Sequence, residues 1–323
     1  MVYTWKAREG QDQRASHNIL AFYAGRFFRI APLYYCLLIV SGVMLTSLAS
    51  MHDVILKTFP PPWVTGGEEY SPHTAWSFSN LKWFLLHVTF LYGLVPGMEA
   101  STPLPDWSLS LEMQFYLMFP FLLVLFRKAP WILIALFAAI LAYFSPRLFG
   151  NYLDAGFLSH FGQPSLIAYR LNAFLAGMVV AYWLKERHGG VAIKPSRQLY
   201  LGLTALICIL PMTKLVILLF VMFVLLAVGR APILTRLFSI KPLRYLGEIS
   251  YSIYLCHLLI LTPTIYWLIT HTSFVSFSPI MRFVIAVLVT GPMVILTSSL
   301  LYWFIEKPPI KIGRYLIKKL RRY

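Results

Sequence analysis

Long apolar runs alternate with short polar and basic segments along most of this chain. An apolar helix of roughly 17–25 residues is long enough to cross a bilayer. The pattern therefore predicts an all-α protein, a polytopic transmembrane helical bundle of about eight spans. The predicted spans cover residues 30–50, 108–126, 130–146, 166–184, 199–213, 214–229, 247–269 and 280–304.

Lysine and arginine gather at the ends of these spans, and the positive-inside rule places such clusters in the cytoplasm. The strongest clusters include the lead-in 1–29 and the basic tail 307–323. An even number of crossings must separate neighbouring clusters, so the apolar stretch 81–96 is predicted to be interfacial or re-entrant. It would lie within an extracytoplasmic loop, 51–107. The chain, 1–323, is then a single multi-pass membrane domain with both termini cytoplasmic.

Composition supports a membrane protein and argues against nucleic acid as a partner. The chain is 59% hydrophobic and 12% charged, whereas soluble domains are about 25% charged. Its net charge of +16 comes from basic residues at span ends, so the lipid bilayer explains it better than DNA or RNA does. The three cysteines lie in apolar runs, and no spacing of metal-ligating residues predicts a metal site.

The segment that begins at Asp106 places a carboxylate inside an apolar helix. Two prolines precede Asp106, which can cap the first turn of the helix that follows. Glu112 lies about one turn inside, where a charge costs on the order of 2.5–3.5 kcal/mol. Ser108 and Tyr116, four residues to either side, share its helical face.

Three roles are open for Glu112. It could orient a catalytic histidine, bind a sugar hydroxyl, or neutralise a buried arginine. Arg170 and Arg282 are possible partners, because each lies early in a predicted span. A structural ion pair is thus a serious alternative to a catalytic role.

Arg26 and Arg29 place two guanidinium groups on one face of the helix that enters the membrane. Such a pair can bind phosphate bidentately, and an acyl-coenzyme A carries several phosphates. The alternative is a positive-inside anchor with no ligand.

A second polar stripe opens the span 247–269. At about 100° per residue, Ser250, Tyr254 and His257 fall on one helical face. A histidine in that position could be a general base or a proton relay. The alternative is a buried polar stripe that holds neighbouring helices together.

Taken together, these stretches resemble the acyltransferase 3 family of integral membrane O-acyltransferases. Each segment is a weak pattern alone, but four in the family's order are fairly specific. The matching segments are 26–34, 107–116, 246–257 and 302–308.

The resemblance implies a bundle of about ten spans in the complete family fold. It implies transfer of an acyl group, often acetyl, from cytoplasmic acyl-CoA to a hydroxyl. Acyl-CoA, which is acetyl-CoA in the family's usual chemistry, is implied as a co-substrate, and no bound cofactor is expected. The acceptor would be a surface glycan or a lipid-linked sugar, and the location the plasma (inner) membrane.

The resemblance also suggests which residues act. His257 and Glu112 are the catalytic candidates, although the family's usual histidine would lie upstream of this chain. Arg26 and Arg29 match the family's double-arginine motif and are the donor-binding candidates. Supporting positions, from the resemblance and from the helical faces, are Trp107, Ser108, Tyr116, Ser250, Tyr251 and Tyr254.

One departure from the family concerns the start of the chain. The family usually begins with two further spans, and this sequence opens where the second of them would end. Met1 is therefore expected to be an internal methionine of a longer protein.

Two functions compete with acyl transfer as interpretations of this sequence. They are a proton-coupled transporter and an inactive, truncated remnant.

Overall fold

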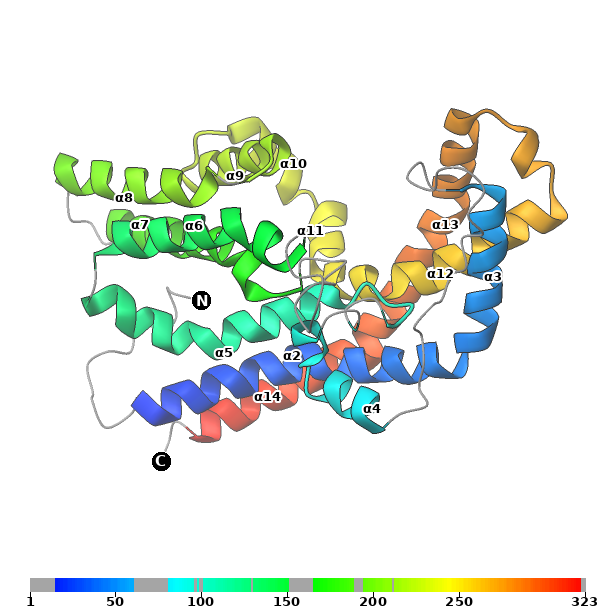
Figure 1. Cartoon of the computed structure of the whole chain (residues 1–323), viewed down its shortest axis with the longest axis horizontal. Helices are drawn as coiled ribbons and strands as arrows, with labels where there is room; N and C mark the ends of the chain where they lie inside the picture. The colour runs from blue at the N-terminus through cyan, green and yellow to red at the C-terminus, as the bar shows by residue number, and fades with distance from the viewer. Residues whose placement is uncertain are drawn as a thin grey trace. The chain divides into compact units, whose positions relative to one another are not determined.

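A computed structural model of the chain (Figure 1) describes part of its sequence. The predicted lead-in up to residue 14 lies outside the described residues, as does the part of the predicted loop between 61 and 80. Within the described part the secondary structure is helical, without a strand. This agrees with the predicted all-α fold. The described residues are 15–60, 81–95, 98, 101–128, 130–150, 165–188, 194–210 and 212–320.

The chain divides into two compact units, and each draws on separated stretches of sequence. The first comprises Met1–Leu20, Gly93–Pro96 and Ser108–Tyr245. Its helices α6, α7 and α8 pack on one another. The elements in this part of the chain are α5 (Trp107–Lys128), α6 (Trp131–Gly150), η3 (Ile167–Tyr169), α7 (Leu171–His188), α8 (Pro195–Ile209), α9 (Lys214–Ala227), α10 (Pro232–Ser239) and α11 (Lys241–Glu248).

Specific polar and aromatic contacts hold the first unit together. The side-chain amide of Asn172 on α7 donates to the carbonyl of Cys208 on α8 at 2.8 Å. The rings of Phe115 on α5 and Phe174 on α7 stack with centroids 4.1 Å apart. Such contacts fix the positions of α5, α7 and α8 along one another, whereas apolar packing alone would allow these helices to slide.

The second unit comprises Ala21–Tyr92, Gly97–Trp107 and Leu246–Tyr323. In it, α12 packs along α13 and against α3. The elements that lie wholly or partly in it are α2 (Ala15–Val43), α3 (Leu45–Thr58), α4 (Leu81–Val88), η2 (Tyr92–Leu94), α12 (Ser250–His271), η4 (Phe274–Ser276), α13 (Pro279–Leu301), the π-helical turn η5 (Tyr302–Glu306) and α14 (Lys307–Leu320).

Helices α2 and α14 run side by side in the second unit (Figure 1). A Cβ atom on Gly313 of α14 would lie 2.8 Å from Cβ of Phe28 on α2. Small residues allow membrane helices to approach this closely. The C-terminal helix is therefore packed against the segment that carries Arg26 and Arg29.

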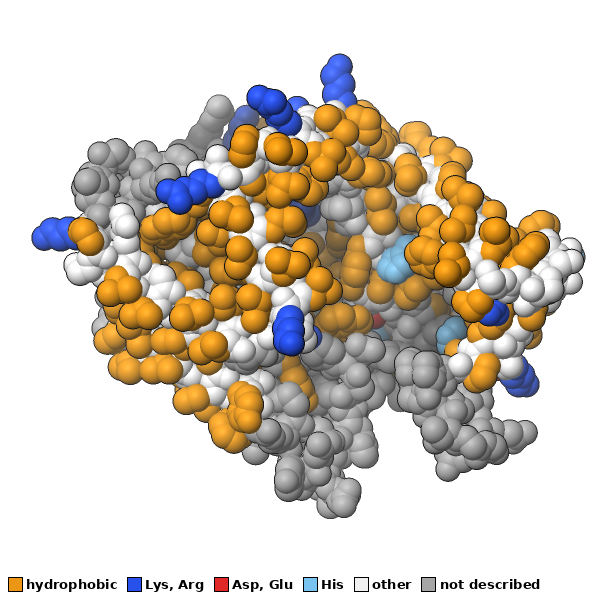
Figure 2. Space-filling model, turned by 90° about the horizontal axis from the view of Figure 1, so that it is seen from above, with side chains coloured by type: hydrophobic (Ala, Val, Ile, Leu, Met, Phe, Trp, Pro, Cys, Tyr) orange, Lys and Arg blue, Asp and Glu red, His pale blue; other side chains and the backbone are white. Residues whose placement is uncertain are grey.

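Four described helices are long and apolar enough to cross a membrane, and the bent pair α9–α10 could make a fifth. The eight predicted spans all fall on helices, but α6 and α7 contain shorter apolar stretches. Hydrophobic side chains predominate on the face shown in Figure 2, with few charged groups among them. Such a surface suits a bilayer, so the chain is a multi-pass membrane protein. The four helices are Ile19–Val43, Trp107–Phe126, Ser250–His271 and Pro279–Lys318.

The first span differs from the predicted range 30–50. The apolar helix runs from Ile19 to Val43, and a new helix, α3, begins at Leu45. The two arginines lie within this helix, and long cationic side chains are tolerated there because they can extend their charge along an apolar surface. The predicted interfacial stretch 81–96 contains α4, whose eight residues span only about 12 Å.

Candidate functional site

Two tyrosines fix α12 to other segments of the second unit. The hydroxyl of Tyr251 donates to the carbonyl of Ile30 on α2 at 2.8 Å. The hydroxyl of Tyr254 donates to the carbonyl of Pro105 at 2.5 Å. Two of the predicted supporting residues therefore hold α12 against the arginine helix and against the segment that leads into α5.

His257 lies one turn beyond Tyr254 on α12 and is half-buried. Its Nδ1 lies 2.7 Å from the carbonyl oxygen of Tyr254. Because a carbonyl can only accept, Nδ1 carries the proton in this contact. In the tautomer with the proton on Nδ1, Nε2 is the acceptor, which is the arrangement a general base requires.

Ser250 stands apart from the other two members of the predicted stripe. It is exposed at the start of α12, and its hydroxyl donates to the carbonyl of Gly247 at 2.9 Å. The rings of Tyr254 and His257, in contrast, have centroids 6.1 Å apart. The structure thus brings Tyr254 and His257 together and uses Ser250 to satisfy a backbone carbonyl before the helix.

A buried carboxylate on η5 was not among the site residues predicted from the sequence. Oε2 of Glu306 accepts a hydrogen bond of 2.7 Å from the hydroxyl of Ser252 on α12. Glu306 is only 3% exposed and interacts electrostatically with Arg29 of α2. Single π-helical turns often occur at functional sites, where they turn a side chain away from the regular helical path. Through this carboxylate the turn hydrogen-bonds to α12 and interacts electrostatically with Arg29 of α2.

The two predicted donor-binding arginines lie one turn apart on α2. The guanidinium carbon of Arg26 lies 5.7 Å from the centre of the Phe22 ring. Arg29 is exposed, although it interacts with the buried Glu306. The negative charge of this carboxylate favours a guanidinium nearby, and the N–H groups of a guanidinium can bind an anion such as phosphate.

Asp106 is fully buried immediately before α5, where the sequence predicted a helix cap. Its Oδ2 accepts a hydrogen bond of 3.1 Å from Tyr34, and its backbone carbonyl accepts one of 2.5 Å from Tyr92. Its Oδ1 is buried with no hydrogen-bond partner. Burial raises the pKa of this carboxyl to about 7, against the weaker lowering effect of hydrogen bonds from Thr102 and Tyr34.

A second histidine, His87, is fully buried in the same unit. Its ring lies between those of Trp83 and Tyr92, with centroid distances of 3.8 and 4.4 Å. Nδ1 donates to the carbonyl of Trp83 at 2.9 Å, and Nε2 lies 3.1 Å from Oγ of Ser101. Burial lowers the pKa of His87 to about 4, so the ring is neutral at physiological pH.

The hydroxyl of Ser101 has one proton and two acceptors within reach. One is Nε2 of His87, and the other is the carbonyl of Met98 at 2.7 Å. Because His87 and Ser101 are both almost wholly inaccessible to solvent, this pair fixes the segment before Asp106. The helix that carries His87 ends at Val88, so the chain reaches Ser101 outside a helix and helical periodicity could not reveal the pair.

The predicted residues on α5 belong largely to the first unit. Trp107 begins the helix, and Ser108 follows it. The hydroxyl of Tyr116 donates to Oε1 of Glu112, as their shared helical face predicted. Glu112 is half-buried, so the phenol satisfies part of the hydrogen-bonding capacity of a carboxylate within a span.

Gly93 is enclosed by hydrogen bonds within the first unit, one of them to Ser110, two residues before Glu112 on α5. Its N–H donates to Oγ of Ser110 at 3.1 Å, and its carbonyl accepts from the hydroxyl of Ser165 at 3.0 Å. The amide of Gln114 then donates to the carbonyl of Ser165 at 2.9 Å. These contacts fix the start of α5, and with it the position of Glu112 on the helix.

Comparison with known proteins adds two matches. The family model Acyl_transf_3, described as an acyltransferase domain, matches residues 12–303. The peptidoglycan O-acetyltransferase OatA of Listeria monocytogenes is 27% identical over 335 residues, which cover 94% of this chain and 48% of the relative. The chain thus spans about half the length of this curated relative. No solved structure matches the chain.

Proposed function

Because the chain belongs to the acyltransferase 3 family, we propose that it is a membrane-embedded O-acyltransferase for a cell-surface carbohydrate. The transferred group is acetyl, and the donor is acyl-coenzyme A. The similarity to a peptidoglycan O-acetyltransferase supports a glycan hydroxyl as the acceptor.

The observation that carries this proposal is the orientation of His257. Its Nδ1–H is engaged by the carbonyl of Tyr254, so Nε2 can take a proton. In the proposed reaction, Nε2 removes the proton of the acceptor hydroxyl as that oxygen attacks the thioester carbonyl. The C–S bond breaks as the new C–O bond is completed, and the coenzyme A thiolate leaves and takes the proton from the imidazolium.

The donor's phosphates would bind to Arg26 and Arg29 on α2. Guanidinium groups suit phosphates because their N–H groups can bind two oxygens at once. Glu306 supports this assignment, because its buried carboxylate interacts electrostatically with Arg29 and favours a cation at that place on α2. In this proposal, Arg29 contacts the donor and Glu306 positions Arg29.

Glu112 keeps its predicted role of orienting a histidine or the acceptor. A carboxylate that accepts a hydrogen bond from Tyr116 can accept further hydrogen bonds from other donor groups. We place the chain in the plasma (inner) membrane with the arginine end of α2 and both termini at the cytoplasm. That orientation gives Arg26 and Arg29 access to a soluble coenzyme A ester.

The test uses the complete natural protein, purified into proteoliposomes with radiolabelled acetyl-coenzyme A and a soluble oligosaccharide acceptor. The wild-type protein should transfer label to the acceptor, and the Arg29→Ala and Glu112→Ala variants should transfer much less. Arg236→Ala on α10 is a matched control, because it removes an exposed arginine from the first unit. Unchanged transfer by the two site variants, at normal expression, would refute their roles. Proton-coupled substrate uptake without any acyl donor would instead identify a transporter.

A further inference from the structure

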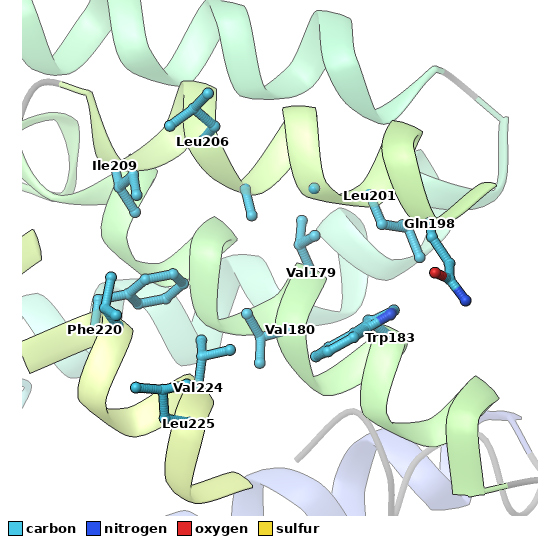
Figure 3. Close-up of a pocket in the computed structure, with 13 residues that line it drawn as sticks. Val179, Val180, Trp183, Gln198, Leu201, Leu206, Ile209, Phe220, Val224 and Leu225 are labelled. Atoms are coloured by element: carbon cyan, nitrogen blue, oxygen red, sulfur yellow. The ribbon is translucent and has the colours of Figure 1, made fainter. Parts of the chain in front are cut away.

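A cavity of about 460 Å³ lies among α7, α8 and α9 of the first unit (Figure 3). Aliphatic and aromatic side chains form nearly all of its lining, including Val180 on α7, Leu206 on α8, and Phe220 and Val224 on α9. Nothing in the proposed acyl transfer uses this cavity. Its size and lining fit a hydrocarbon ligand rather than a sugar or a nucleotide.

The cavity has one polar end. Figure 3 shows Gln198 and Trp183 together at one end, and Ile209 and Phe220 at the other. Two exposed cations, Lys194 and Arg197, lie on the same end of α8 as Gln198. Arg197 is held there by a hydrogen bond of 2.9 Å to the hydroxyl of Tyr182. An amphiphile with an apolar tail and an anionic head would match this distribution.

The length of the cavity matches one leaflet of a bilayer. Gln198 and Ile209, at its two ends, are separated along α8 by about 16 Å at 1.5 Å per residue. Half of a hydrocarbon core is about 15 Å. A single acyl chain entering from the basic end would therefore fill the cavity and end near the bilayer centre.

Gly202 keeps the middle of the cavity open. It lines the cavity from within α8, and a Cβ atom there would meet no atom within 4 Å. Glycine within a helix is less favourable than alanine by about 1 kcal/mol, so the sequence forgoes helical stability at this position. The space is consistent with a ligand that lies against the bare backbone.

We propose that this cavity binds one acyl chain of an anionic phospholipid, with the lipid phosphate at Lys194 and Arg197. The surrounding surface agrees with access from the bilayer, because Leu199, Leu203 and Leu210 on α8 are exposed. Lys194 and Arg197 lie just before the predicted span 199–213, and the positive-inside rule places such basic span ends at the cytoplasmic surface, where anionic lipids are enriched.

Trp183 provides a direct reporter of occupancy. The full chain in detergent would be titrated with phosphatidylglycerol or phosphatidylcholine that carries brominated acyl chains, which quench a tryptophan in contact with them. We expect a saturable quenching phase with phosphatidylglycerol, and the loss of that phase in Trp183→Phe. Arg197→Gln should weaken phosphatidylglycerol binding about fivefold and leave phosphatidylcholine unaffected.

Two matched leucine variants test the cavity itself. Gly202→Leu fills it and should abolish the saturable phase, whereas Gly177→Leu should retain it. Gly177 lies on α7 outside the cavity lining, and a Cβ there also meets no atom within 4 Å. Ala205→Leu, a second substitution in the lining, serves in place of Gly202→Leu if that variant does not fold.

Three results would overturn the proposal. The first is a saturable phase that is equal in the cavity-filling and control variants, and the second is equal affinity for the two lipids in the wild type. The third is unchanged quenching in Gly202→Leu, combined with light scattering that shows a dimer for the wild type and a monomer for Gly202→Leu. That last result would identify a second copy of the chain as the occupant.

Discussion

The hydroxyl of Ser252 donates a hydrogen bond of 2.7 Å to the buried carboxylate of Glu306, 54 residues further along the chain. This contact joins the first turn of α12 to the π-helical turn before α14. Arg29 of α2 interacts with the same carboxylate. A single acidic side chain thus hydrogen-bonds to α12 and interacts electrostatically with α2, the helix that carries the proposed donor site.

Replacing Ser252 should destabilise the protein, whereas replacing its neighbour Ser250 should not. Ser252→Ala leaves Oε2 of Glu306 buried without this donor, which costs about 1–3 kcal/mol. Ser250→Ala is a matched control, because Ser250 is exposed and bonds only the carbonyl of Gly247. Thermal unfolding in detergent should show a lower midpoint for Ser252→Ala alone. Equal midpoints would mean that the Glu306 contact adds nothing to stability.

The base proposed on α12 can be tested with two histidines of the same helix. His257→Gln should lower the rate of acyl transfer about a hundredfold to ten-thousandfold, because it removes the proton acceptor. His271→Gln should retain activity, because His271 is exposed at the C-terminal end of α12. Single-turnover transfer from labelled acetyl-coenzyme A gives the rate, and binding of the unlabelled donor provides a separate readout. Full activity in His257→Gln would exclude this residue as the base.

Local periodicity predicted much of the fold and part of the site. The apolar runs predicted the helices, and the spacing of four residues predicted that Tyr116 would meet Glu112. The same reasoning grouped Tyr254 with His257, whose rings lie near each other. These successes share a cause, because each contact occurs within one helix and follows its 3.6-residue period.

Contacts between segments that are distant in the sequence could not be predicted from helical periodicity. Ser252 lies two residues from Ser250 and so points about 200° away from the predicted polar face. Its partner Glu306 lies in the segment 302–308, which resembles a family pattern but gives no indication of this contact. Asp106 was predicted as a cap, but its carboxylate accepts from Tyr34, 72 residues earlier in the chain. No helical period links such pairs, since they depend on how helices pack.

The buried Asp106 should make stability fall as the pH rises towards neutrality. Its pKa is raised to about 7, so the folded protein holds a proton that the unfolded chain releases near pH 4. The stability that this group contributes is full below about pH 4 and is lost as the pH rises through 7. Asp106→Asn keeps an oxygen for Tyr34 but cannot ionise, so it should remove this slope.

Unfolding midpoints measured from pH 5 to pH 8 would check the effect of Asp106. The wild type should lose stability over this range, and Asp106→Asn should lose less. Glu248→Gln, which neutralises an exposed carboxylate on α11, should behave like the wild type. Identical slopes in all three proteins would show that Asp106 ionises normally in the folded state.

The last prediction concerns Gly93, where even one methyl group should be harmful. A Cβ atom there would lie 2.4 Å from Oγ of Ser110 and 3.2 Å from Cβ of Ser165. Its φ lies outside the left-handed region, so lack of space, not backbone strain, opposes a side chain. Gly93→Ala should therefore cost about 1–3 kcal/mol by overpacking.

Gly177→Ala on α7 is the matched control and should act in the opposite direction. Its new methyl group meets no atom within 4 Å, and alanine is favoured over glycine in a helix by about 1 kcal/mol. Unfolding midpoints should thus fall for Gly93→Ala and rise for Gly177→Ala. Acyl transfer should also fall in Gly93→Ala, because Ser110 lies half a turn before Glu112 on α5 and must move to admit the methyl group. A Gly93→Ala protein with wild-type stability would show that Ser110 can rotate away, and Glu112 would then not depend on this contact.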